Sequence, residues 1–251
     1  MTLANQTVLL TGGAGDLGGR IARRLTGRGA KVVVLDRQAP KDGAYEAVQA
    51  DLSTAEGLEA AADQVRRQAP SILVNLAGLQ HFGPFEAESV EHLQMTYMVN
   101  LVAPVRLAQA ALPGMRARGS GQIVNVGSIF ASINFAYFTT YSSSKAGLKG
   151  FSQALRRELA GSGVGVTYVA PRAIRTAFNS SKVMEFAART RMKLDDPDRV
   201  ADRLVRAIAQ RERDVYLGFP EAFFVRLNAV APGLVDLALA GSDRSVARMF
   251  T

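Results

Sequence analysis

The stretch that decides the fold is Thr7-Val8-Leu9-Leu10-Thr11-Gly12-Gly13-Ala14-Gly15-Asp16-Leu17-Gly18, near the start of the sequence. Its first four residues are β-branched or aliphatic, which predicts a buried strand. The glycines predict a tight turn, and Ile21, Ala22 and Leu25 then recur at helical spacing. A strand, a glycine turn and the amino end of a helix form a pyrophosphate site, because bare backbone lets the phosphates approach unpaired N–H groups.

A second strand is predicted at Lys31–Leu35, and it ends at Asp36. Dinucleotide folds place a carboxylate near this point to accept hydrogen bonds from the adenosine ribose, although a surface charge at a strand end is the alternative. Arg37 follows directly and could bind a 2′-phosphate. Gly13 and Ala14 add no basic group to the turn, so we expect NAD(H) to be preferred, with NADP(H) as the alternative.

A second informative stretch is Tyr141-Ser142-Ser143-Ser144-Lys145, with Ser128 thirteen residues before the tyrosine. A helix brings positions i and i+4 onto one face, so the phenol and the ammonium would point into one cleft. A free tyrosine has a pKa of about 10, and a nearby cation lowers that pKa toward the range of a proton shuttle. Taken alone, the spacing also fits a solvated side-chain pair.

Together these residues resemble short-chain dehydrogenases/reductases of the compact branch, from about residue 5 to about residue 218. Further motifs that carry the resemblance are Ala50-Asp51-Leu52, Asn75-Leu76-Ala77-Gly78, Met98-Val99-Asn100-Leu101, Gly121-Gln122-Ile123-Val124-Asn125-Val126-Gly127-Ser128 and Thr176. Leu76 stands where the family usually has a second asparagine.

The resemblance implies four catalytic residues. Tyr141 would be the general acid/base, and Lys145 would lower its pKa and bind the nicotinamide ribose. Ser128 would orient the substrate oxygen, and Asn100 would hold a water that relays protons to Lys145. The implied cofactor-binding residues are Gly12, Gly15, Asp16, Leu17, Gly18, Asp36, Arg37, Asp51, Leu52, Asn75, Ala77, Gly78, Tyr141, Lys145, Pro171, Ile174 and Thr176.

Two sets of positions depart from the compact branch. Asp16 stands where that branch usually has glycine, and the resulting Thr-Gly-x-x-Gly-x-x-Gly spacing is commoner in the extended branch, although little chain remains for its substrate domain. Arg172 stands where the family usually has glycine after Pro171. With Arg175 it could meet cofactor phosphate, an anionic substrate or solvent.

Length and composition limit the other function classes. The chain has 251 residues, which suits one α/β domain with an ample core. It has no cysteine and only two histidines, so we expect no disulfide, no thiolate chemistry and no metal site. The segment Met1–Asn5 lacks the features of an export signal, which favours the cytoplasm. The net charge of +8 is spread along helices, and no nucleic-acid interface is indicated.

Strand and helix patterns alternate, which predicts a Rossmann-type, doubly wound parallel sheet in three α/β/α layers and a single domain. Residues 1–218 would form the dinucleotide-binding catalytic domain, and residues 219–251 an apolar extension packed on it or on a partner. The predicted strands are 7–10, 31–35, 71–75, 122–126, 164–169 and 214–217, and the predicted helices 54–68, 88–117 with breaks near Pro104 and Pro113, 141–160 and 197–210.

The predicted substrate cleft has aromatic walls. Its expected lining is Phe130, Phe135, Phe138, His81 and a mobile segment from Phe178 to Leu194, with core packing as the alternative for each phenylalanine. Such walls favour a substrate with an apolar portion. Lys182, Arg189 and Arg191 leave room for a carboxylate or a thioester carrier.

The apolar tail, with Phe223, Phe224, Val230 and Leu234, is too interrupted to span a membrane. Core and dimer packing, a lid over the cleft, and a peripheral membrane contact remain open. We expect a homodimer or homotetramer. The resemblance implies an NAD(P)-dependent oxidoreductase that interconverts a secondary alcohol and a ketone. A cofactor-sensing regulator and an extended-branch epimerase are the alternatives.

Overall fold

The structure is a computed structural model that describes residues 3–40 and 45–251. Met1 and Thr2, which open the segment expected to lack an export signal, lie outside these residues. The described chain forms a seven-stranded parallel sheet in the order β3-β2-β1-β4-β5-β6-β7. The strands are β1 (Thr7–Thr11), β2 (Lys31–Asp36), β3 (Glu46–Gln49), β4 (Ile72–Asn75), β5 (Gly121–Val126), β6 (Val164–Ala170) and β7 (Asp214–Tyr216).

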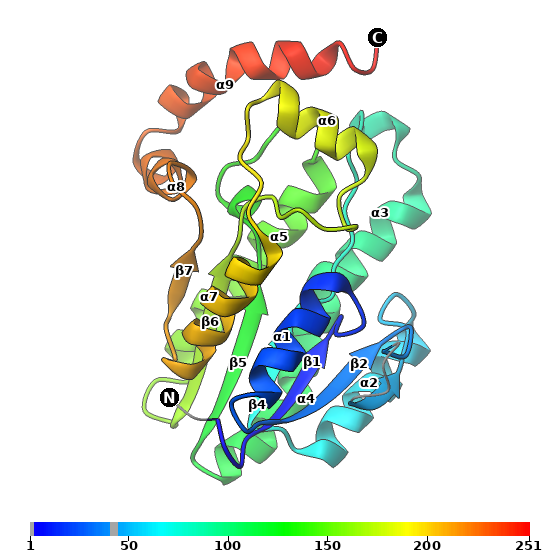
Figure 1. Ribbon diagram of the computed structural model, residues 1–251, viewed down its shortest axis with the longest axis vertical. Helices are drawn as coiled ribbons and strands as arrows, with labels where there is room; N and C mark the ends of the chain where they lie inside the picture. Colours follow the sequence, from blue (N-terminus) through cyan, green and yellow to red (C-terminus); the bar gives the residue numbers. More distant parts are fainter. Residues whose placement is uncertain (1–2, 41–44) are drawn as a thin grey trace.

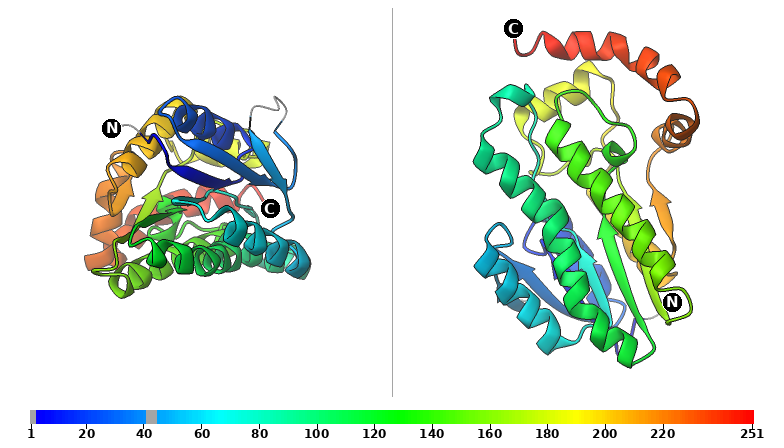
Figure 2. Two further views of the ribbon diagram at one scale, coloured as in Figure 1. Left: turned by 90° about the horizontal axis from the view of Figure 1, so that it is seen from below. Right: turned by 180° about the vertical axis from the view of Figure 1, so that it is seen from behind.

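Helices cover both faces of this sheet, as Figures 1 and 2 show. The helices are α1 (Asp16–Thr26), α2 (Ala55–Gln68), α3 (Val90–Tyr97), α4 (Ala103–Ala117), α5 (Thr139–Glu158), α6 (Ser181–Arg189), α7 (Pro197–Ala209), α8 (Glu221–Val230) and α9 (Pro232–Ala247). Helices α1 and α7 pack on one face, and α2, α4 and α5 on the other. The α/β class and the doubly wound parallel sheet predicted from the sequence are confirmed.

The sheet reverses its winding direction between β1 and β4. Thr11 lies opposite both Leu35 and Asn75, and Asn75 lies opposite Asn125, so the carboxyl ends of the central strands meet at one edge. Open α/β sheets bind their ligands in the crevice at such a switch point. The register therefore gathers the glycine turn, Asp36 and the ends of β4 and β5 around one place.

The helical segment predicted over residues 88–117 forms, with an interruption just before Pro104. A π-helical turn at Met98–Val102 separates α3 from α4. Pro104 lies at the start of α4, directly after this turn, and Pro113 lies inside the helix. The interruption expected near Pro104 therefore occurs just before that residue, whereas the one expected near Pro113 was wrong. The segment 178–194, expected to be mobile, contains the helix α6.

The tail folds as two helices. Helix α8 ends at Val230, and α9 begins at Pro232, so the helical structure breaks just before Pro232-Gly233, where the sequence predicts a break. Helix α9 contacts α6, and it lies across the end of the molecule beyond the strands' carboxyl ends (Figure 1). Among the residues that the structure describes, no helix is both long and apolar enough to span a bilayer. The domain boundary at residue 218 stays a prediction.

Candidate active site

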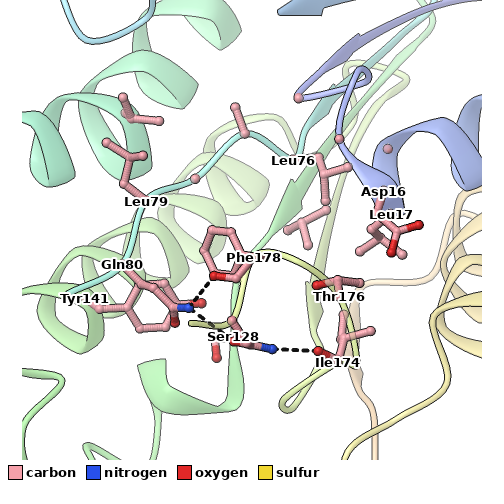
Figure 3. A pocket seen from close by; sticks show the side chains of 18 of the residues that line it. Asp16, Leu17, Leu76, Leu79, Gln80, Ser128, Tyr141, Ile174, Thr176 and Phe178 are labelled. Carbon is pink, nitrogen blue, oxygen red and sulfur yellow. Dashed lines mark hydrogen bonds between the residues drawn. The ribbon is translucent and has the colours of Figure 1, made fainter. Parts of the chain in front are cut away.

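A cavity of about 570 Å³ lies at the carboxyl edge of the sheet. Its wall includes the predicted residues Gly12, Gly15, Asp16, Leu17, Gly18, Asp36, Arg37, Asp51, Leu52, Ala77, Gly78, Ser128, Tyr141, Lys145, Pro171, Ile174 and Thr176. Figure 3 shows the Asp16–Leu17 turn on one side and Tyr141 with Ser128 on the other. The structure thus brings together residues that are far apart in sequence.

The glycine turn has the shape that a phosphate site requires. Gly12 has a φ of +72°, and a Cβ there would lie 2.9 Å from the backbone of Ala77. A Cβ on Gly18 would lie 2.1 Å from the carbonyl oxygen of Gly12. Only glycine fits at both places, so the turn stays narrow at the amino end of α1.

Thr11 was not predicted as a site residue, yet it fixes this turn against β4. Its Oγ1 accepts hydrogen bonds from the backbone N–H groups of Leu76 at 3.0 Å and of Ala77 at 3.1 Å. The family resemblance begins its glycine motif at Thr11, which is the signal that could have identified it. These bonds hold the backbone of the Leu76–Gly78 segment beside the turn.

The two predicted carboxylates have ordered surroundings. Asp36 Oδ2 accepts a hydrogen bond of 3.0 Å from the N–H of Ala14, so this carboxylate is tied to the glycine turn. Asp51 accepts from the N–H and the hydroxyl of Ser53. These hydrogen bonds stabilise the ionised carboxylate and lower the pKa of Asp51. Both groups can act as hydrogen-bond acceptors for a nucleoside.

These features fit a dinucleotide. Gly12 and Gly18 have no Cβ, which would fill the turn at either position. Phosphates can therefore approach the backbone at the start of α1. Asp36 lies at the end of β2, where a ribose would lie in this fold. The residues present therefore suit a nicotinamide dinucleotide.

Tyr141 and Lys145 lie on α5 and are both buried. Burial raises the pKa of Tyr141 to about 12, although its interaction with the Ser128 hydroxyl lowers that pKa in part. Burial also lowers the pKa of Lys145 to about 8. Burial thus dominates at Tyr141, and the lowering of its pKa by Lys145 stays a prediction. Lys145 Nζ lies over the phenol ring, 5.9 Å from its centroid, and donates to the carbonyl of Val126.

Ser128 follows β5 and is also buried. Its hydroxyl accepts a hydrogen bond of 3.2 Å from the N–H of Phe130. A serine hydroxyl that accepts from the backbone keeps its own proton for donation to another oxygen. Tyr168 packs beneath this corner so closely that a Cβ on Gly127 would lie 2.1 Å from its hydroxyl.

Asn75 and Asn100 differ from the other predicted residues because neither lies on the cavity wall. Asn75 donates to Asn125 inside the sheet. The side chain of Asn100 accepts from the N–H of Leu79 and donates to the carbonyl of Leu79 and to Ser144. Asn100 thus fastens the segment after β4 to α5, and its proposed water stays a prediction.

The aromatic end of the cavity is built from several elements. Phe130, Phe138 and Phe186 line it, and the rings of Phe138 and Phe186 lie 5.1 Å apart. Gln80, which was not predicted as a site residue, donates a hydrogen bond of 2.8 Å to the carbonyl oxygen of Phe178 (Figure 3). Phe135 and His81 were expected on this wall but lie off it, because Phe135 packs against Phe130 inside the aromatic cluster.

Of the five basic residues suggested for an anionic group near the cleft, Arg172 lines the cavity and the others do not. The guanidinium of Arg172 forms a 2.6 Å ion pair with Asp195. This pair joins the two ends of the segment that carries α6, so the suggested contact of Arg172 with a phosphate is not supported. The other four, which are Arg175, Lys182, Arg189 and Arg191, are exposed and lie off the cavity wall.

One cluster beside the cavity was not anticipated. His81, Glu88 and His92 place possible metal-ligand atoms within 4.8 Å of one another, and no other such cluster occurs in the part of the chain that the structure describes. Both oxygens of Glu88 already accept hydrogen bonds, from His92 and from Thr140. The expectation of no metal site stays a prediction.

Comparison with known proteins finds a matching family and several relatives. A family model described as "short chain dehydrogenase" matches residues 6–185. The chain is 31% identical to "Ketoacyl reductase HetN" of Nostoc sp., over 95% of this chain and 85% of that protein. It is 36% identical to "2,3-dihydroxy-2,3-dihydro-p-cumate dehydrogenase" of Pseudomonas putida, over 70% of this chain and 73% of that protein.

A solved structure resembles the whole fold. The short-chain dehydrogenase from Sphingobium yanoikuyae, in complex with NADPH, superposes with a TM-score of 0.80. Its sequence is 29% identical, and the match covers 92% of this chain and 95% of that one.

Proposed function

Since the chain belongs to the short-chain dehydrogenase/reductase family, we propose that it is an NAD(P)-dependent oxidoreductase that interconverts a secondary alcohol and a ketone. One observation carries the proposal. Buried Ser128, Tyr141 and Lys145 line the same cavity as the glycine turn and Asp36. A cofactor-sensing regulator needs the turn but has no use for a buried phenol, hydroxyl and ammonium beside it.

The glycine turn would hold the pyrophosphate at the start of α1, and Asp36 would accept from the adenosine ribose. When bound, the nicotinamide cofactor supplies or accepts the hydride. Lys145 would contact the ribose next to the nicotinamide. Asp51 would accept from the adenine.

Tyr141 would move the proton. With a pKa raised to about 12, the phenol holds its proton at neutral pH and can donate it to a carbonyl oxygen. Ser128 would donate a second hydrogen bond to that oxygen and orient it. In alcohol oxidation the same phenol must first lose its proton, so high pH should favour oxidation over reduction.

The substrate would have an apolar portion. Phe130, Phe138, Phe186, Val183 and Met192 line the end of the cavity next to Tyr141 and offer no charge. NAD(H) as the preferred cofactor, the cytoplasmic location and a homo-oligomeric state also remain proposals.

The test is the oxidation of NADH or NADPH with a panel of ketones, followed by absorbance. We expect Tyr141→Phe to lower kcat by roughly 10² to 10⁴, because it removes the proton donor. The dissociation constant for the cofactor should stay near that of the wild type. Tyr137→Phe is the matched control, since Tyr137 stacks on Phe250 away from the cavity. Cofactor binding without turnover of any ketone would favour the regulator, and near-normal kcat in Tyr141→Phe would contradict the mechanism.

A further inference from the structure

The chain has only two histidines, and both lie in the cluster beside the cavity. Their rings are 5.6 Å apart and tilted by 57°. His92 lies on α3 and lines the cavity, with its side chain 33% exposed. His81 lies behind it, off the cavity wall. His92 is therefore the imidazole that a substrate can reach.

Glu88 fixes the orientation of the His92 ring. The Glu88 side chain is only 1% exposed, and its Oε1 lies 2.8 Å from Nδ1 of His92. Its Oε2 accepts a 2.5 Å hydrogen bond from the hydroxyl of Thr140, the residue before Tyr141. A buried carboxylate thus connects the start of the catalytic helix with the imidazole on the cavity wall.

This connection sets the hydrogen-bonding character of His92. The Glu88 carboxylate can only accept, so Nδ1 of His92 must carry the proton that it donates. In neutral imidazole, Nε2 then has a lone pair and accepts. Nε2 lies on the other side of the ring from Glu88, and no hydrogen bond to it occurs among the described residues. Nε2 of His81 is buried without a hydrogen-bond partner, whereas Nε2 of His92 is not buried.

We propose that His92, oriented by Glu88, binds a hydroxyl group of the substrate that is separate from the reacting carbonyl. Most of the remaining wall near Tyr141 is apolar, and the amide of Gln80 is already bonded to Phe178 and Asn179. The substrate class is therefore a hydroxy ketone, or the corresponding diol, with an apolar remainder. This inference rests on the proposed function. It is consistent with the relative named as a dihydroxy-dihydro-p-cumate dehydrogenase, whose name indicates two hydroxyl groups.

The test uses matched pairs of phenyl ketones. One member of each pair has a hydroxyl group one, two or three carbons from the carbonyl, and the other lacks it. We expect at least one pair to show a preference for the hydroxylated member of roughly tenfold in kcat/KM, mostly through KM, the size of one hydrogen bond. In Tyr141→Phe protein loaded with cofactor, the dissociation constants for that pair should differ by a similar factor.

Three variants assign the preference to His92. His92→Phe keeps a ring beside His81 but removes the acceptor, so the ratio within the pair should fall to near one. Glu88→Gln should lower the ratio in part, because its amide can donate to Nδ1 and release the tautomer. Glu91→Gln is the control, because Glu91 is an exposed neighbour on α3 off the cavity wall and should leave the ratio intact.

The outcomes separate the two proposals. If the wild type reduces no ketone, the proposed function is wrong and this inference falls with it. If both members of every pair are reduced and bound equally well, only the inference is wrong. A ratio that survives His92→Phe also overturns it. So does a ratio that EDTA abolishes, because a metal ion would then recognise the hydroxyl.

Discussion

Lys145 is a cation enclosed in the core, and this makes the stability of the protein depend on pH. Burial lowers its pKa to about 8, from 10.5 in the unfolded chain. Between these values the unfolded chain binds more protons, so the free energy of unfolding should increase as the pH rises from 8. The full effect is on the order of 3 to 4 kcal/mol, at about 1.4 kcal/mol per pKa unit.

This prediction is checked by urea unfolding of the cofactor-free protein between pH 8 and pH 10. Above pH 10 the Tyr141 phenol opposes the gain, because its raised pKa lets the folded state keep a proton that the unfolded chain has lost. Lys145→Met serves as the control, since it has no proton to lose. An equal slope in wild type and Lys145→Met would show that Lys145 is not the source.

Asp36 decides the cofactor preference at the scale of one side chain. Its carboxylate is held by the N–H of Ala14 and by the N–H of Gln38. A carboxylate fixed in this place can accept from a ribose 2′-hydroxyl and would repel a 2′-phosphate. We expect kcat/KM to be higher with NADH than with NADPH on one ketone, and Asp36→Ala to narrow the gap. A wild type that favours NADPH tenfold would show that the exposed Arg37 controls the choice instead.

Two neighbouring glycines at the amino end of α1, Gly18 and Gly19, allow a test of how this helix and its turn bind the cofactor. A Cβ on Gly18 would lie 2.1 Å from the carbonyl oxygen of Gly12, whereas on Gly19 the nearest atom would be 3.9 Å away. We expect Gly18→Ala to distort the turn, lower the melting temperature and weaken cofactor binding. Gly19→Ala should fold and bind normally, and in a helix it should stabilise by about 0.5–1 kcal/mol. Cofactor titration and thermal unfolding of both variants check this, and equal behaviour would contradict it.

Some elements could be predicted from the sequence better than others. The difference is whether the contacts that define an element are local or join residues far apart in the sequence. Strands β1, β4 and β5 are nearly all buried, so they appear as apolar runs that local pattern identifies. By contrast, the side chain of Asn100 in the turn at Met98–Val102 bonds Leu79 and Ser144, and no local pattern contains these contacts. The same difference between local and long-range contacts applies to the candidate active site. Glycine spacing indicated the phosphate turn, whereas the Glu88–Thr140 bond joins residues 52 positions apart.

At the scale of the whole molecule, the tail packs on the aromatic cluster that includes part of the cavity wall. Val225, Val235 and Val246 of α8 and α9 are buried in the same cluster as Phe138 and Phe186. Removal of residues 220–251 would expose this cluster, and we expect aggregation or loss of stability. Leu148 and Leu155, which recur at helical spacing on α5, are also buried within the chain, so they offer no surface to a second copy.

The outer side of the tail presents a different apolar surface. Phe223, Val230, Leu234 and Leu237 are exposed, with Leu237 at 76%. A patch of this kind marks an interaction site, and a second copy of the chain is the partner expected from the sequence. We expect Leu234→Asp combined with Leu237→Asp to reduce the mass measured by light scattering without lowering the melting temperature. Val246→Asp, at a site only 1% exposed, should instead destabilise the fold. If wild type and the double variant have the same mass and only the wild type sediments with liposomes, the surface binds lipid and does not form a dimer.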